Sequence, residues 1–266
     1  MSAQNLKYNA YSLQDISVAA SQRLTSNILY NQLAEKTINI QSDSIRDGWS
    51  LLDVKYTNKI IAVNGWLISD TAANLKTLID TFKGSLRPND KNLDIETYGG
   101  SGVYTRWKAT VRNIQIPEEH WQISQKPFSV EFLCKPFATA TSTTTINLNS
   151  GGNITTTPYN EDITISGSYN PKPVITITVV AETDLTAIKF ENTVTQDWIQ
   201  VARSFTAAEV LVIDCDAETV KVDGVAVDFT GIFPEFNPST NSIKITSTDS
   251  GTFQITCSIV YYLTYL

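Results

Sequence analysis

Histidine is the first residue type to look for in a search for reactive groups, and this chain of 266 residues has only one, His120. It follows Pro117-Glu118-Glu119 in a polar stretch typical of a surface connection. Hydrolase triads and imidazole metal clusters both depend on histidine, because its ring exchanges protons and binds metals near neutral pH. We therefore expect His120 to be a solvated loop residue, and we predict no catalytic triad.

The three cysteines, Cys134, Cys215 and Cys257, lie far apart in the sequence, and each falls within an apolar strand pattern. Zinc sites built from cysteine usually pair ligands a few residues apart, and no such pair occurs. An odd and sparse set of cysteines is also a poor disulfide framework. We expect three buried, reduced thiols and synthesis in a reducing compartment.

One acidic stretch, Asp214, Asp216 and Glu218, resembles the start of a calcium-binding loop. Such a loop needs Gly at its sixth position and Glu at its twelfth. Thr219 and Val225 occupy those positions, so we do not expect calcium there.

Carboxylates on predicted strands and a glycine-rich loop are two further patterns that could support chemistry. Asp53, Asp94 and Glu96 lie on predicted strands, which leaves a carboxylate pair for glycoside hydrolysis open as a weaker alternative. The loop Gly99-Gly100-Ser101-Gly102 leads into another strand pattern, whereas a phosphate-binding loop leads into a helix. The sequence therefore predicts a hairpin tip at this loop. We predict no catalytic, cofactor-binding or metal-binding residues, and no enzyme.

The composition favours a folded protein of one or two domains. Hydrophobic residues make up 42% and charged residues 18% of the chain, with a net charge of −7. Nucleic-acid binding needs clustered Lys and Arg, so this balance argues against it and suits a surface along which DNA slides without binding. The N-terminus, MSAQNLKYNAYSLQDIS, has no apolar core of a signal peptide, and no run approaches a membrane span. We expect a soluble protein made in a cytoplasm.

The elements that would position these residues are mostly strands. Residues 1–45 are polar with scattered apolar positions, and residues 16–33 leave a short helix and irregular strands both open. Asp70 is the expected N-cap of one helix over residues 71–83, whose stripe of Leu75, Leu78, Ile79 and Phe82 predicts packing against a sheet. Gly84 is expected to close that helix. Around it, strands are predicted over residues 51–56, 59–68, 93–98, 103–116 and 127–134.

The second half of the chain predicts a separate β-sandwich or jelly roll. A Thr/Ser-rich linker, with room for one edge strand around residues 146–148, is expected over residues 139–157, between an N-terminal domain of residues 1–138 and a C-terminal domain of residues 158–266. Asp223-Gly224 predicts a two-residue hairpin turn that pairs Val222 with Val225 and Val220 with Val227 on one face. The same alternation predicts Ile213 opposite Val220 and Leu211 opposite Val222. The other predicted strands cover residues 163–166, 174–180, 185–190, 197–201, 242–247 and 252–263.

Five short motifs occur in a fixed order in the C-terminal half. They are Ile213-Asp214-Cys215, Asp223-Gly224, Phe233-Pro234-Glu235-Phe236-Asn237-Pro238, Asn241-Ser242-Ile243 and the aromatic strand Ile259-Val260-Tyr261-Tyr262. In that order they resemble the C-terminal domain of siphophage distal tail proteins. Ser239 stands where the family usually has glycine, so the turn there is expected to differ.

The N-terminal half resembles the ring-forming belt domain of the same family. The residues that carry this resemblance are Asp47-Gly48, Lys59-Ile60-Ile61-Ala62-Val63, the helix over 75–86 and the exit segment 128–137. The first 40 residues match no part of the family that we can place.

The resemblance implies a structural virion protein rather than a catalyst. It implies a ring of six copies at the distal end of the tail, joining the tail tube to the tip or baseplate hub, with a receptor-binding protein as a further partner. DNA would pass through the ring, and a galectin-like C-terminal domain would project outward. The alternative is a carbohydrate-binding β-sandwich, in which Trp198, Tyr169 or Tyr159 would stack on a sugar ring.

Overall fold

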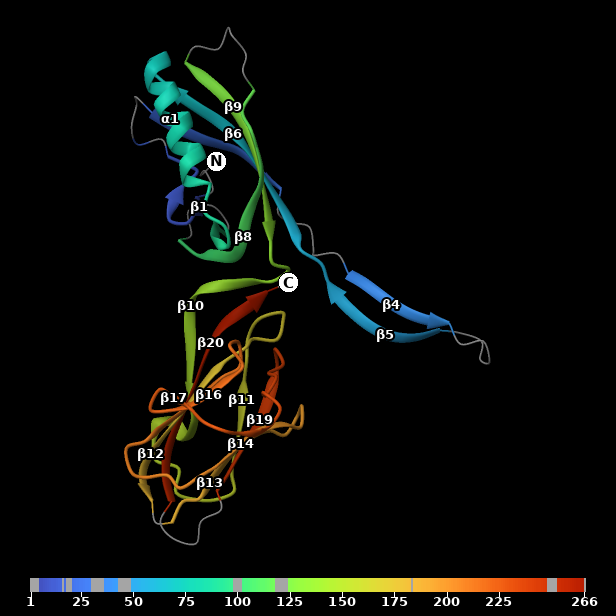
Figure 1. Ribbon diagram of the computed structural model, residues 1–266, viewed down its shortest axis with the longest axis vertical. Coiled ribbons are helices and arrows are strands. Elements are labelled where there is room, and N and C mark those ends of the chain that lie inside the picture. The colour runs from blue at the N-terminus through green and yellow to red at the C-terminus, as the bar shows by residue number, and fades with distance from the viewer. Residues whose placement is uncertain are drawn as a thin grey trace. The chain divides into compact units, whose positions relative to one another are not determined.

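The computed structural model describes residues 5–15, 17, 21–29, 36–42, 49–97, 102–117, 124–182, 184–247 and 253–265. The chain divides into two compact units, which we call unit 1 (Met1–Thr141) and unit 2 (Ser142–Tyr265). Both units are built from antiparallel strands, and the described residues contain one α-helix, which lies in unit 1 (Figure 1). The predicted fold class, mainly β with one helix in the N-terminal half, is confirmed.

Unit 1 contains a sheet with the strand order β3-β6-β9-β8-β7-β1-β2. The elements of unit 1 are β1 (Leu6–Tyr8), β2 (Tyr11–Ser12), β3 (Ser21–Leu29), β4 (Lys36–Ser42), β5 (Trp49–Tyr56), β6 (Lys59–Ser69), α1 (Ala72–Ser85), β7 (Lys91–Glu96), β8 (Tyr104–Gln115), β9 (Gln125–Cys134) and the start of β10 (Ala138–Asn147). The longest pairing joins β6 to β9, from Lys59 opposite Cys134 to Ile68 opposite Gln125. The strands of the first 45 residues, β1 to β4, were left undecided by their polar sequence.

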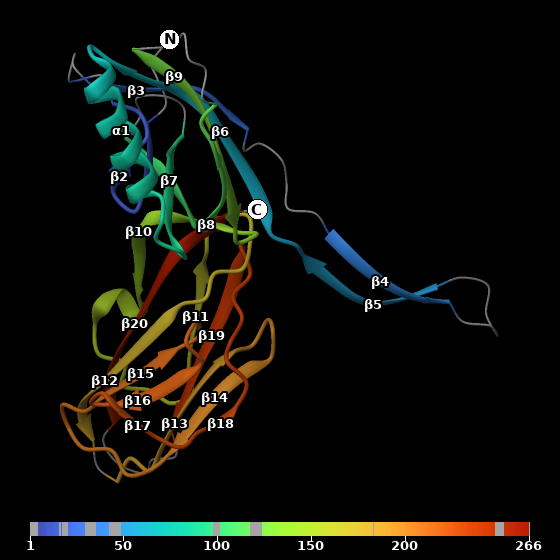
Figure 2. The same cartoon turned by 45° about the horizontal axis from the view of Figure 1, so that its top comes forward.

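Helix α1 covers one face of this sheet (Figures 1 and 2). Leu75, Leu78 and Phe82 on the helix are buried, as the predicted stripe requires. Phe82 packs against Phe128 of β9, with ring centroids 4.8 Å apart. The residues of β6 alternate between buried and partly exposed, so one face of the strand is buried. Helix α1 packs against β6.

The ends of α1 differ from the prediction. The N-cap is Thr71, whose hydroxyl accepts a hydrogen bond from the backbone N–H of Asn74 at 3.2 Å. Asp70 lies one residue earlier, and its carboxylate accepts from the Asn74 side chain at 2.8 Å. Gly84 lies within the last turn, and the C-cap is Leu86. The sequence contains two adjacent residues that can cap, and only backbone geometry decides between them.

Strands β4 and β5 form a two-stranded sheet of their own (Figure 1). The register places Ile38 opposite Val54 and Asn39 opposite Asp53, so apolar and polar pairs alternate along the hairpin. Among the described residues neither strand pairs with any other strand of the chain. We refer to residues 36–56 as the arm. Isolated two-stranded hairpins are only marginally stable in water, so the arm is a candidate for burial against another molecule.

Unit 2 consists of two antiparallel sheets around a shared core (Figure 2). One sheet has the order β17-β16-β15-β12-β20-β10, and the other has the order β11-β19-β13-β14-β18. The elements after β10 are η1 (Leu148–Gly151), β11 (Tyr159–Thr164), β12 (Val174–Glu182), β13 (Ala187–Asn192), β14 (Asp197–Ala202), β15 (Val210–Asp214), β16 (Thr219–Val222), β17 (Val225–Ala226), β18 (Thr230–Gly231), β19 (Thr240–Ser247) and β20 (Phe253–Tyr265). The core takes residues such as Ile177 from one sheet and Phe190 from the other.

The predicted register of the β15–β16–β17 meander is correct. Leu211 lies opposite Val222, and Val222 lies opposite Val225. Asp223 and Gly224 both have positive φ, 49° and 80°, as a type I′ turn requires. Val225 shares the face of Val222 by this register, but it is 68% exposed because β17 lies at the edge of its sheet.

The Thr/Ser-rich segment predicted as a linker is instead largely secondary structure. Residues Thr139 and Ala140 of β10 pair with β8 in unit 1. The boundary between the units falls at Thr141, and the rest of β10 adjoins β20 in unit 2. Threonine favours strands, so the composition that suggested a linker also fits an edge strand.

Candidate functional site

The described residues contain no cluster of three His, Cys, Asp or Glu side chains able to hold a metal ion. His120 and residues 99–101 lie outside the described residues. No described helix is long and apolar enough to cross a membrane.

The three cysteines are free and buried, as predicted. Burial raises the pKa of Cys134 and of Cys215 to about 12, and it raises the pKa of Cys257 as well. The thiolate is the reactive form of cysteine, so these three groups are inert near neutral pH. They act as small apolar side chains of the two cores.

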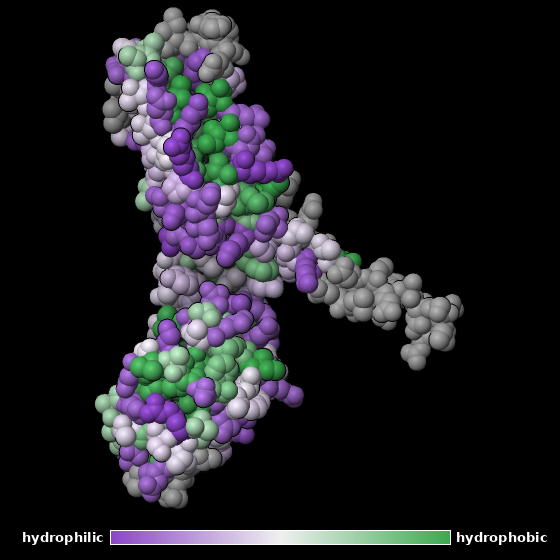
Figure 3. Space-filling model, viewed as in Figure 1, coloured by the Kyte–Doolittle hydropathy of each residue, from purple (hydrophilic) through white to green (hydrophobic). Residues whose placement is uncertain are grey.

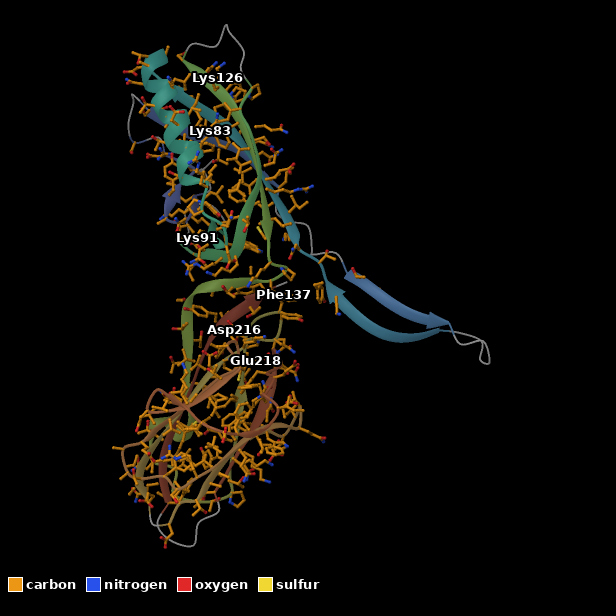
Figure 4. All side chains as sticks on the ribbon, viewed as in Figure 1. Lys83, Lys91, Lys126, Phe137, Asp216 and Glu218 are labelled. Atoms are coloured by element: carbon orange, nitrogen blue, oxygen red, sulfur yellow. The ribbon has the colours of Figure 1, made fainter. Side chains whose placement is uncertain are left out.

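The acidic stretch at the β15–β16 connection is a turn and not a calcium loop. One carboxylate oxygen of Asp214 accepts hydrogen bonds from the backbone N–H groups of Asp216 and Ala217, at 3.0 and 2.9 Å. Asp216 and Glu218 are exposed at this end of the hairpin (Figure 4). The Asp214 carboxylate therefore stabilises the turn.

Two of the three candidate strand carboxylates of unit 1, Asp94 and Glu96, also have structural partners, and the side chain of Asp53 lies outside the described residues. Asp94 forms a two-bond ion pair with Arg106 on the neighbouring strand, at 2.7 and 2.9 Å. Glu96 is buried and accepts hydrogen bonds from the backbone N–H groups of Asn5 and Gly102, at 3.1 and 2.8 Å. These contacts hold β7 to β8 and tie down two loop residues, which gives both carboxylates a structural role.

The aromatic residues proposed for sugar stacking are engaged within unit 2. The Lys189 ammonium lies 4.7 Å above the Trp198 ring centroid, so the lysine covers one face of the indole. Gly231 of β18 passes so close that an added Cβ would lie 1.9 Å from the Trp198 carbonyl oxygen. Tyr159 packs on the core and donates its hydroxyl to Glu161. Tyr169 bridges to Thr264 at the end of β20.

A buried asparagine pair explains the most characteristic motif of the C-terminal half. Asn241 is fully buried, and its side-chain oxygen accepts from the Asn237 N–H and from the Asn192 side chain, at 3.0 and 3.1 Å. Its side-chain amide donates to the carbonyls of Asn237 and Ser239, at 2.9 and 3.0 Å. Asn192 in turn donates to the Glu235 carbonyl at 2.7 Å. The pair thus fixes the loop of residues 233–239.

Ser239 fits this loop without strain. It is absent from the residues with positive φ, so the turn does not require the glycine that is usual in the family. Its carbonyl accepts from the backbone N–H of Ile165, at 3.0 Å, as well as from Asn241. The sequence places Asn241 in a motif but does not reveal its part in fixing the loop, because its hydrogen-bond partner Asn192 lies 49 residues earlier.

The second candidate surface is the face of the unit 1 sheet opposite α1. Leu24, Trp66 and Pro127 form one row across β3, β6 and β9, and Ile60 lies opposite Leu133 in another. Leu24, Ile60 and Leu133 are each about two-fifths exposed, at 38%, 43% and 38%. Trp66 and Pro127 also line a shallow pocket of 280 Å³ on this face. Together with the arm, this face exposes several of the apolar groups of unit 1.

Charge is divided unevenly between the two units. Residues 1–141 contain 15 Lys and Arg against 13 Asp and Glu, whereas residues 142–265 contain 5 against 14. The formal charges are therefore +2 for unit 1 and −9 for unit 2. The acidic balance that suggested a DNA-repelling channel thus belongs to unit 2, and unit 1 is close to neutral.

Comparison with known proteins gives a consistent result. Residues 166–261 match the model of the siphovirus-type tail component, C-terminal domain. The crystal structure of the SPP1 Dit (gp 19.1) protein, described as a paradigm of the hub adsorption apparatus in Gram-positive infecting phages, aligns with 99% of this chain and 100% of its own, at 13% identity and a TM-score of 0.72. A chain of the phage P2 baseplate aligns over 97% of this chain and 98% of its own at 9% identity, but its TM-score of 0.46 supports no argument. A search of curated protein sequences found no match.

The fold defines a class of protein: a mainly β chain of two units of antiparallel strands. The candidate side chains that the structure describes pack in the cores or form hydrogen bonds that stabilise the fold. Within that class, residues 166–261 match the C-terminal domain of siphovirus-type tail components, and the whole chain has a fold similar to that of SPP1 Dit. The resemblance to siphophage distal tail proteins is confirmed.

Proposed function

We propose that this protein is a structural component of a siphophage tail, a ring of six copies at the distal end that joins the tail tube to the tip or baseplate hub. The observation that carries the proposal is the similarity of fold to SPP1 Dit over 99% of the chain, together with the family match of residues 166–261. The protein would be made in the host cytoplasm, would reside at the tail tip and would have no enzymatic activity or cofactor.

In this proposal unit 1 is the belt that forms the ring. Two features support that role: the arm, which pairs with no other strand in the described part of the chain, and the apolar rows on the sheet face opposite α1. Contacts between two different surfaces of identical subunits generate a closed ring when the rotation between subunits is right. Burial of the arm against a neighbouring copy would also cover its unpaired strand edges.

Unit 2 would be the outward, galectin-like domain. Its acidic charge of −9 would disfavour adhesion to DNA and leave its surface to protein partners, a receptor-binding protein among them. DNA would pass through the ring without specific binding. Because Lys189 covers one face of Trp198, any contact with a host glycan would be weak.

The mass of the purified protein in solution tests this proposal. We expect a species of about six times the 29.4 kDa subunit mass, and electron micrographs of a six-fold ring. Replacement of residues 36–56 by a short turn should leave both units folded and reduce the mass to that of the monomer. A stable full-length monomer that neither forms rings nor enters tails, and that binds glycans on an array, would instead support the carbohydrate-binding alternative.

A further inference from the structure

The segment of residues 225–232 displays more apolar surface than its fold requires. It runs from β17, at the edge of one sheet of unit 2, to β18, at the edge of the other. Val225 is 68% exposed, Ile232 is 70% exposed and Phe229 is 37% exposed. We call this segment the apolar edge. Figure 3 shows apolar surface on the face of unit 2 where β16 and β17 lie.

Of the three exposed side chains, Phe229 packs its ring against Phe233, with ring centroids 5.2 Å apart, whereas Val225 and Ile232 are not those that hold the segment in place. Val227 packs on the core of unit 2, and its N–H donates to the Val220 carbonyl at 3.1 Å. Phe233, just after the segment, also packs on the core. The backbone N–H of Ile232 donates to the Trp198 carbonyl at 2.8 Å. Since inward groups and backbone bonds already anchor the segment, the outward side chains need another explanation.

Elsewhere, the sheet that contains β18 shows the usual pattern, with polar groups on the outside, while the other sheet also exposes Val180 and Tyr262, at 41% and 46%. The partly exposed positions of β13 hold Lys189 and Glu191, and those of β19 hold Ser242, Lys244 and Thr246. Single exposed apolar residues are normal in soluble proteins, whereas apolar residues that gather on one surface are typical of interaction sites, and three exposed apolar residues fall within these eight positions.

The charges around the apolar edge indicate the kind of partner. Asp228 lies within the segment and Asp223 in the turn before it, and both are exposed, while Lys221 faces Ala226 across the hairpin. Two of the five cations of unit 2, Lys189 and Arg203, are paired with glutamates. With 5 Lys and Arg against 14 Asp and Glu, unit 2 has a negative field, which favours a partner surface of opposite charge.

We propose that the apolar edge is the docking site of another tail protein, whose contacting surface combines apolar side chains with Lys or Arg. Val225, Phe229 and Ile232 would form the buried centre of the contact, with Asp228 at its rim. This inference rests on the proposed function only in placing the partner within the tail.

Amide hydrogen exchange measured on the isolated ring and on purified tails tests the proposal. We expect residues 225–232 to exchange at least tenfold more slowly in tails than in the ring. Equal exchange in both, with the segment open, would overturn docking at this edge. Protection already present in the isolated ring would show that a second copy covers the segment and would also overturn the proposal. If the chain were absent from purified tails, both the docking proposal and the proposed function would be overturned. The mass of the purified protein tests ring formation independently of docking at the apolar edge.

Substitutions test the chemistry of the contact. V225D/I232D should leave the ring mass unchanged and deplete one other protein from purified tails at least fivefold, whereas V180D, at a position 41% exposed on β12, should not. D228K should weaken the same association, while D216K, an equal change of charge at an exposed turn, should have no effect. Unchanged tail composition for V225D/I232D with an intact fold, measured by circular dichroism, would contradict the proposal.

Discussion

The side chain of Asn241 illustrates how one buried amide can determine a loop. It makes four hydrogen bonds, two as acceptor and two as donor, to Asn192, Asn237 and Ser239. Asn241→Ala removes all four and leaves the Asn237 N–H and the Asn192 amide short of partners, so we expect a loss of about 2–4 kcal/mol in the free energy of unfolding. Thermal or urea unfolding measures this loss.

Asn160→Ala is the matched control for that substitution. Asn160 is exposed on β11 opposite Lys244, and its replacement should change stability by less than about 0.5 kcal/mol. If the two variants were equally stable, Asn241 would not hold the loop of residues 233–239.

The buried thiols predict an alkaline loss of stability. Burial raises the pKa of Cys134 and of Cys215 from 9.0 to about 12, so between those values the unfolded chain loses these protons while the folded chain keeps them. The stabilisation is complete below pH 9 and falls as the pH rises, by about 1.4 kcal/mol per pH unit for each thiol. Urea titrations between pH 8 and 11 should show this slope, and Cys215→Ala should reduce it. An unchanged slope in that variant would mean that other groups cause the loss.

At the level of elements, the cap of α1 can be tested directly. Thr71 accepts the Asn74 N–H, so Thr71→Ala should destabilise the protein by about 1 kcal/mol. Asp70→Ala should have a smaller effect, because Asp70 bonds to the side chain of Asn74 and not to the helix backbone. Thermal unfolding of the two variants decides between them, and a larger loss for Asp70→Ala would restore the cap that the sequence suggested.

The elements that the sequence predicted are those with a strong local pattern. The stripe of Leu75, Leu78 and Phe82 located α1, and Asp223-Gly224 determined the register of the β16–β17 hairpin. Strands β1 to β3 were missed because their pairing is non-local: Leu6 pairs with Ile95, which lies 89 positions away. The contacts of Asn241 and the exposure of Val225 likewise depend on which strands become edges, and short-range patterns do not specify that.

At the level of the whole molecule, unit 2 has the features of an independent domain. Its buried cluster draws all its members from residues 148–261, with no contribution from unit 1, and both of its sheets contribute. Its charge of −9 also distinguishes it from unit 1, at +2. A domain with its own core can fold alone, whereas the features proposed to form a ring, the arm and the exposed apolar rows, belong to unit 1.

We therefore expect a fragment of residues 142–265 to fold as a monomer. It should unfold in a single cooperative transition by calorimetry, because one contiguous core supports it. Its mass by light scattering should be that of one copy, while the full chain forms the ring. If the fragment were unfolded, unit 2 would depend on the start of β10 and its pairing with β8 through Thr139 and Ala140. If the fragment itself formed a six-fold ring, the ring contacts would lie in unit 2, and the assignment of unit 1 as the belt would be wrong.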